Sequence, residues 1–304
     1  MIEMLANQLS PASFIVIAFC VGLISGSFLN VVILRLPNQL NIHWKTEAEA
    51  FLGIESSDKV KSIDTLVWPP SKCSDCGSLI KPWQNIPVIS YILLRGRCDQ
   101  CSSVISFQYP LIEIITALLV AFTAYNFGLT SRGLLAIVLV IALICLAGID
   151  TKAKLLPDQI TLPLLWLGLL ANTAGMFISL TDAVFGAILG YLSLWTFHWM
   201  FKLITGKEGI GYGDFKLMAV IGAWLGWQML PLILLIATGM GAMVGIYAIV
   251  IGGKDRNFQI PFGPFIATAG WIGLIWGDKI IVWYQSLFIA VSYTHLRAHE
   301  TLQH

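Results

Sequence analysis

Long apolar stretches separated by short polar segments run through the chain as far as about residue 290. A membrane-spanning helix needs about 20 predominantly apolar residues. Eight stretches approach that length, and we expect a helix in each: 13–34, 110–127, 133–149, 160–178, 183–203, 214–228, 230–251 and 262–290. The sixth is short because Gly222, Gly226 and Pro231 interrupt a longer apolar region. The pattern predicts an all-α integral membrane protein with about eight transmembrane helices.

Composition supports the same class of protein. Of the 304 residues, 57% are hydrophobic and only 12% are charged. A soluble domain of this size cannot hide so much apolar surface, so most of it must face lipid. The formal net charge of +1 gives no indication of a nucleic-acid partner. The lipid bilayer is therefore the first partner that the sequence predicts.

The lysines and arginines between the expected spans predict the orientation, because cytoplasmic connections are enriched in positive charge. Connections after the third, fifth and seventh spans contain Lys152, Lys154, Lys202, Lys207, Lys216, Lys254 and Arg256. Connections after the second, fourth and sixth spans contain only Arg132. We therefore expect the first group, and by alternation the long segment 35–109, on the cytoplasmic side.

Two aspartates lie at the boundaries of apolar spans. Asp150 follows the apolar run 134–149, and Asp214 stands in Gly211-Tyr-Gly-Asp-Phe-Lys216 where the next span begins. The orientation puts both at the cytoplasmic face. A carboxylate at a membrane boundary loses hydration and so calls for a functional reason. Two such groups brought together can share one proton and activate a water for peptide hydrolysis.

Other roles for these acids stay open from the residues alone. Asp214 could cap the N-terminus of its helix, where a carboxylate is favourable. Asp158, which follows Pro157, is a rival partner for Asp214 and also resembles a residue at the start of a helix. Paired carboxylates also serve proton relays, so a proton-coupled transporter is the alternative from a different functional class.

Four cysteines form two C-x-x-C pairs in the cytoplasmic segment: Cys73, Cys76, Cys98 and Cys101. Two such pairs about 20 residues apart are typical of a structural tetrathiolate zinc site. Gly77 and Gly96 flank the pairs and allow tight backbone turns. Cytosolic thiols stay reduced, which disfavours disulfides. We expect a closed zinc site without a catalytic position.

Two more polar residues stand among apolar ones. Glu113 lies one turn inside the second span, where it could contact a substrate or a donor molecule, or extend toward water. His198 lies among Trp195, Phe197 and Trp199, which suggests an interfacial aromatic belt rather than a ligand.

The chain resembles the bacterial type IV prepilin peptidase family, whose members are also called leader peptidase/N-methyltransferases. The resemblance rests on the aspartate motif around Asp214, the segment from Asp150 to Pro163, and both cysteine pairs. Further matching motifs lie at residues 26–37, 86–91, 109–113 and 261–265. Ile210 replaces a common methionine of the family, an apolar exchange.

The resemblance implies an aspartic protease with eight spans in the bacterial inner membrane. It implies cleavage of type IV prepilin or pseudopilin leaders at the cytoplasmic face, followed by methylation of the new N-terminal residue with S-adenosyl-L-methionine. By residue-to-residue matching, the catalytic residues fall on Asp150 and Asp214, and the zinc ligands on the four cysteines. A peptidase without methyltransferase activity is the nearest alternative. The sequence has no glycine-rich adenosyl motif, so methyl transfer is implied by the resemblance alone. If methylation occurs, we expect its pocket to involve the cytoplasmic segment and the adjoining ends of the first two spans, so that substitutions around Asn30, Arg35 or Glu113 reduce methylation while sparing cleavage.

The expected organisation has four parts. Residues 1–34 contain the first span, 35–109 form the cytoplasmic loop with the zinc site, and 110–290 form a membrane domain of seven spans. Residues 291–304 are abruptly polar, contain His295 and His299, and do not match the family. We expect this last part to be a tail that is not native to the protein.

Overall fold

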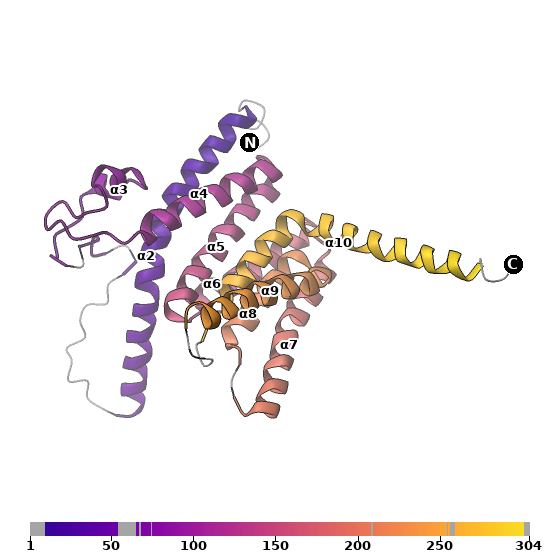
Figure 1. Cartoon of the computed structure of the whole chain (residues 1–304). Coiled ribbons are helices and arrows are strands. Elements are labelled where there is room, and N and C mark those ends of the chain that lie inside the picture. Colours follow the sequence, from indigo (N-terminus) through magenta and orange to yellow (C-terminus); the bar gives the residue numbers. More distant parts are fainter. Residues whose placement is uncertain are drawn as a thin grey trace. The chain divides into compact units, whose positions relative to one another are not determined.

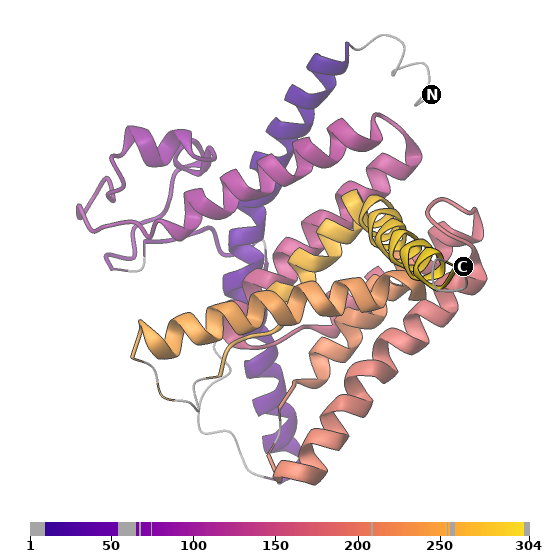
Figure 2. The same cartoon turned by 45° about the vertical axis from the view of Figure 1, so that its right-hand side comes forward.

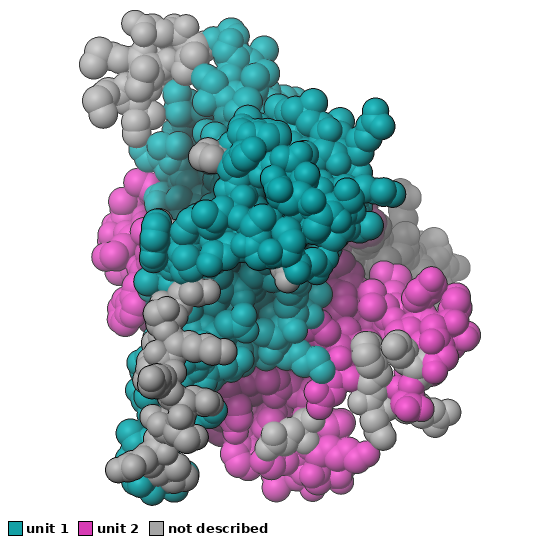
Figure 3. Space-filling view, turned by 90° about the vertical axis from the view of Figure 1, so that its left-hand side faces the viewer, with its two compact units in different colours: residues 1–164 teal, residues 165–304 magenta. Residues whose placement is uncertain are grey.

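A computed structural model describes residues 10–53, 65–66, 68–73, 75–207, 209–253, 255 and 259–300. In these residues the chain is helical, and extended segments pair only in two isolated bridges, Lys72 with Leu79 and Arg97 with Val104. The chain divides into two compact units, residues 1–164 and 165–304 (Figure 3). Helix α6 (Asp158–Thr173) passes from the first unit into the second.

Three long helices form the first unit: α2 (Pro11–Phe51), α4 (Gln108–Phe127) and α5 (Ser131–Ala153). Helix α4 lies across α2 (Figures 1 and 2), and both contact α5. Helix α2 continues past the expected end of the first span at Leu34. Its exposed C-terminal part is stabilised by pairs one turn apart, His43 with Glu47 at 3.3 Å and Lys45 with Glu49 at 3.7 Å.

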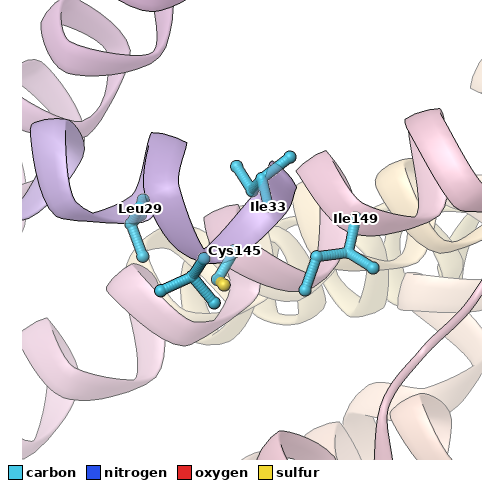
Figure 4. Packing of buried hydrophobic residues seen from close by; sticks show 5 residues of the cluster. Leu29, Ile33, Cys145 and Ile149 are labelled. Atoms are coloured by element: carbon cyan, nitrogen blue, oxygen red, sulfur yellow. The ribbon is translucent and has the colours of Figure 1, made fainter. Parts of the chain in front are cut away.

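The core of the first unit joins α2 to α5. Leu29 and Ile33 of α2 pack against Cys145 and Ile149 of α5 (Figure 4). The contact between α2 and α4 depends on Gly26, because a Cβ atom there would lie 2.7 Å from the Cα atom of Glu113. Small residues allow membrane helices to approach this closely. Between α2 and α4 lie two short helices, η1 (Pro82–Asn85) and α3 (Ile89–Leu93).

The second unit is built around a short, buried helix. It contains α7 (Leu180–Thr205), α8 (Tyr212–Leu225), η2 (Trp227–Met229), α9 (Leu230–Val250) and α10 (Gly263–Glu300). Nearly every side chain of α8 is buried. A methyl group on Gly186 of α7 or Gly222 of α8 would overlap the backbone of the other, so the two helices meet backbone to backbone.

All eight expected ranges contain a helix, which confirms the all-α membrane fold. Six helices of the described part are long and apolar enough to cross a membrane. The other two, α6 with 16 residues and α8 with 14, are shorter than a full span. Helix α10 extends into the expected tail as far as Glu300, while residues 301–304, and the expected cytoplasmic cations Lys254 and Arg256, lie outside the described residues.

Candidate functional site

The four cysteines predicted to bind zinc meet in the first unit. The Sγ atoms of Cys73, Cys76, Cys98 and Cys101 all lie within 4.8 Å of one another. The Sγ atoms of Cys73 and Cys101 are 3.8 Å apart. Zn–S bonds of about 2.3 Å in a tetrahedron place the sulfur atoms about 3.8 Å apart. The cluster therefore has the donors and the spacing of a structural zinc site whose four positions are all filled by protein.

Each cysteine pair lies on a turn of the same form. The N–H of Cys73 donates to the carbonyl oxygen of Ser78 at 2.9 Å, and the N–H of Gly77 donates to that of Cys73 at 3.0 Å. The second pair repeats these bonds, from Cys98 to Ser103 at 2.8 Å and from Ser102 to Cys98 at 3.0 Å. Gly77 has a φ of 70°, and Ser102, in the equivalent position, has a φ of 58°. This repeat directs both pairs of thiols toward one point.

Backbone groups prepare the thiols for a cation. The N–H groups of Cys76 and Asp75 lower the pKa of the Cys73 thiol from 9.0 to about 6. The N–H groups of Cys101 and Gln100 likewise lower the pKa of Cys98. The pKa of the Cys101 thiol is raised, with burial and the neighbouring thiols of Cys76 and Cys98 among the causes. A metal binds the thiolate rather than the thiol, so the turns favour the binding form at Cys73 and Cys98, the first cysteine of each pair.

Asp150 lies in the last turn of α5, and 6% of its surface is exposed. Its carbonyl oxygen accepts the N–H of Lys154 at 2.9 Å, and Lys154 ends the helix in the left-handed conformation. The neighbouring Ile149 belongs to the core formed with α2. The rival Asp158 is exposed and begins α6. Of the two acids, only Asp150 has the burial expected of a tuned carboxyl group.

Asp214 belongs to the second unit, in the first turn of α8, and 7% of its surface is exposed. The N-cap of this helix is Gly211 rather than Asp214. A Cβ atom on Gly211 would lie 3.5 Å from Oδ2 of Asp214, so the glycine keeps the approach to this carboxyl group open. Each aspartate is thus a buried carboxyl at one end of a helix in its own unit, and their pairing stays a prediction.

His198 holds the loop that precedes Asp214. It is buried, unlike the neighbouring Trp195, Phe197 and Trp199, which are exposed as expected of an interfacial belt. The imidazole is 1% exposed, and its Nδ1 lies 2.9 Å from the carbonyl oxygen of Ile210. A carbonyl oxygen only accepts, so Nδ1 is the protonated nitrogen. The ring also contacts the rings of Tyr212 and Phe215, at centroid distances of 5.4 and 5.6 Å. His198 therefore connects α7 to the residues on both sides of Gly211.

Glu113 is also buried, with 8% of its surface exposed, and does not extend toward water. Its Oε2 accepts the N–H of Val88 at 2.8 Å. Val88 has a φ of 59° and a ψ of −46°, and the N–H of Ile89 donates to the carbonyl oxygen of Pro87 across it. This is a γ-turn, a strained form for a β-branched residue. The carboxyl group of Glu113 thus helps to hold a strained turn against α4.

The other two residues expected near a methylation pocket hold the same region together. Asn30 is 4% exposed, and its Nδ2 donates to the carbonyl oxygen of Tyr109 at 3.1 Å, one helical turn before Glu113. Nη1 of Arg35 donates to the carbonyl oxygen of Thr65 at 3.0 Å. Asn30 and Glu113 therefore lie at the crossing of α2 and α4, whereas Arg35 binds the chain that leads toward the cysteines.

The helices, the buried aspartates and the cysteine cluster together define a multi-span membrane protein with a small segment whose four cysteines could hold a metal ion. Residues 20–127 match the bacterial peptidase A24 N-terminal domain, and residues 137–246 match the type IV leader peptidase family. The chain belongs to the type IV leader peptidase family.

Similar proteins carry the name prepilin leader peptidase/N-methyltransferase. One from Pseudomonas aeruginosa is 49% identical over 270 residues, covering 89% of this chain and 93% of the relative. One from Pseudomonas putida is 48% identical over 272 residues (90% and 94%), and one from Aeromonas hydrophila is 47% identical over 279 residues (92% and 96%). No solved structure matches the chain significantly.

Proposed function

We propose that this protein is an aspartic peptidase of the bacterial inner membrane that removes the leader from type IV prepilins or pseudopilins. It then methylates the new N-terminal residue. The observation that carries the proposal is the burial of Asp150 and Asp214, each at the end of a helix, in a chain that shares nearly half its residues with prepilin leader peptidases. A transporter has no support from this family assignment.

Asp150 and Asp214 are the proposed catalytic pair. The lysines that follow α5 and α7 put the C-terminal end of α5 and the N-terminal end of α8 at the cytoplasmic face. There, one aspartate is ionised and acts as general base on a water molecule. The other is protonated and donates to the oxygen of the scissile carbonyl. The two groups titrate as a unit, so the roles belong to the pair.

Substrate binding uses the lipid-facing helices and the glycines near Asp214. The apolar segment of a prepilin lies against the spans, and the junction with its leader enters beside α8. Gly211 leaves room there for a substrate backbone to approach the carboxyl group, because a Cβ atom on it would lie beside Oδ2 of Asp214. Gly213 adds no side chain next to Asp214 in the chain. His198 positions this loop through its bond to Ile210.

The zinc ion is proposed to be structural and to be held by Cys73, Cys76, Cys98 and Cys101. When bound, it ties together the two turns of a segment that has no large apolar core of its own. The hydroxyl groups of Ser78 and Ser103 lie 2.9 and 3.1 Å from the Sγ atoms of Cys76 and Cys101. There they can donate to the ligand sulfurs and steady them.

S-adenosyl-L-methionine is the proposed methyl donor, by the family's name and activity. Its methyl group goes to the amine that cleavage exposes. We propose the crossing of α2 and α4 around Asn30 and Glu113 as the region where substitutions affect this step, because both residues are buried polar groups beside the cytoplasmic segment.

The test is a reaction of the full-length protein in lipid nanodiscs with a type IV prepilin, followed by mass spectrometry of the product. Without donor, we expect loss of the leader alone. With S-adenosyl-L-methionine, the cleaved product should gain the mass of one methyl group in place of hydrogen. A product that is cleaved but never gains this mass would leave a peptidase alone, and an uncleaved prepilin would overturn the proposed function.

A further inference from the structure

The short helix α3 and the turn before it present large apolar side chains to the surroundings. Ile89, Ile92 and Leu93 are 55%, 66% and 69% exposed, and Ile86 is 45% exposed. Leaving side chains of this size in water instead of burying them is unfavourable. Four such residues within eight positions form a patch that needs a covering. We call residues 86–93 the apolar finger.

The apolar finger is attached to the first turns of a helix that is long and apolar enough to cross a membrane. Its turn is bonded to Glu113, through the N–H of Val88 at 2.8 Å. Glu113 comes five residues after Gln108, where α4 begins, which is about 7 Å along the helix axis. Helix α4 is long and apolar enough to cross a membrane. In Figure 2 the finger's segment lies beside the N-terminal end of α4. The finger is therefore level with the outermost turns of α4 rather than far out in the cytoplasm.

Backbone hydrogen bonds within the finger suit an apolar surrounding. The N–H groups of Ser90, Ile92 and Leu94 donate to the carbonyl oxygens of Ile86, Val88 and Ser90, at 3.2, 3.0 and 2.9 Å. The hydroxyl of Ser90 also donates to the carbonyl oxygen of Ile86, at 2.8 Å. Polar backbone groups are tolerated in lipid only when they are satisfied in this way.

Positive charge follows the finger directly. Arg95 and Arg97 are both exposed, one and three residues after Leu94. At the end of an apolar segment, arginines are well placed to bind lipid phosphates, because the guanidinium group binds phosphate with two parallel hydrogen bonds. The order along the chain is thus apolar residues at acyl-chain depth, then cations at headgroup depth.

We propose that the apolar finger inserts into the membrane leaflet on the N-terminal side of α4, with Ile89, Ile92 and Leu93 against acyl chains and Arg95 and Arg97 at the phosphates. The cysteine cluster is thereby anchored to the bilayer surface from two sides, by the finger and by α4. The inference depends on α4 as a membrane span and not on the peptidase activity, so the two can fail separately.

Depth-dependent fluorescence quenching tests the proposal on the full-length protein in nanodiscs. A small fluorescent amino acid is introduced at Ile92. Matched positions are Leu111, which is exposed on the first turn of α4 and marks a shallow lipid-facing site, and Lys81, an exposed polar site of the same segment as Ile92. Quenchers are lipids with a spin label near the headgroup end of the acyl chain, and iodide in the water phase. Zinc content and membrane insertion are checked for each variant.

We expect Ile92 to behave as Leu111 does, with strong quenching by the labelled lipid. Its Stern–Volmer constant for iodide should be several-fold lower than that at Lys81. Iodide quenching at Ile92 equal to that at Lys81, with no effect of labelled lipid, would overturn the proposal. If protection from iodide arises only when a prepilin is added, the finger is a substrate-docking surface, and insertion into lipid is refuted.

Discussion

The hydrogen bond from His198 to Ile210 allows a sharp test of how the loop before Asp214 is held. His198→Asn keeps a side-chain N–H that can replace the Nδ1 donor. His198→Leu has the same number and branching of side-chain heavy atoms as His198→Asn but no donor. Because both variants replace the imidazole ring with a branched side chain of similar length, the difference between them reports mainly on the bond of 2.9 Å.

The size of the effect follows from the burial of the imidazole. A hydrogen bond of this kind contributes about 1 kcal/mol, and a carbonyl left unsatisfied adds up to about 2 kcal/mol more. Each 1.36 kcal/mol lost from the active arrangement lowers the rate about tenfold. We therefore expect His198→Leu to cleave about 5- to 150-fold more slowly than His198→Asn.

The assay is single-turnover cleavage of a prepilin in nanodiscs, with thermal unfolding measured in parallel. A positioning role predicts that the loss appears in the cleavage rate constant and that methylation of an already cleaved substrate is spared. Equal cleavage rates for the asparagine and leucine variants, within twofold, would show that the bond to Ile210 does not position the loop. Equal losses of both activities would indicate general destabilisation instead.

Three further predictions concern the first unit. Purified protein should contain about one zinc ion per chain by elemental analysis. The zinc should be lost in the double variant Cys73→Ser/Cys76→Ser but kept in the control Cys20→Ser. A wild-type protein that contains no metal, but whose cysteine segment still resists proteolysis, would contradict this. Because protons compete with zinc for each thiolate, and backbone N–H groups lower the pKa of Cys73 and Cys98, zinc should stay bound at neutral pH and be released as acidification protonates the thiolates, measured with a chromogenic chelator; release that is already complete at neutral pH would refute the reasoning. Glu113→Gln should lower stability by about 1–2 kcal/mol, since a weaker acceptor then faces the N–H of Val88, and should reduce methylation more than cleavage; unchanged thermal unfolding and methylation would contradict it.

The eight helices could be predicted because each apolar stretch is long enough to dominate its local structure. The extension of α2 to Phe51 could not, since the apolar signal stops near Leu34. That part of the helix depends on pairs such as His43 with Glu47, which contribute only a few tenths of a kcal/mol each. The turns at the cysteines could be predicted from the sequence because the C-x-x-C spacing leaves the backbone little geometric freedom.

Residues whose role depends on tertiary contacts were harder to interpret. The aromatic residues around His198 form the same sequence pattern whether the histidine faces a membrane interface or a protein core. The contact of His198 with Ile210 shows that it faces the core. A lone acid such as Glu113 is similarly ambiguous until its donor, the N–H of Val88, is known. Asp150 is buried whereas Asp158 is exposed, and this difference depends on the core that the end of α5 forms with α2.

The central claim is that Asp150 and Asp214 act as one catalytic unit, and prepilin cleavage by asparagine variants tests it most directly. We predict that Asp150→Asn and Asp214→Asn each lower the single-turnover rate on the order of 10⁴-fold and that the double variant is no slower than either. The matched control Asp158→Asn should cleave within about twofold of wild type, since surface substitutions have small effects. Near-normal cleavage by Asp150→Asn or Asp214→Asn, in protein that is inserted and folded, would contradict the account. Loss of cleavage in Asp158→Asn with retention in Asp150→Asn would move the first catalytic carboxylate to Asp158.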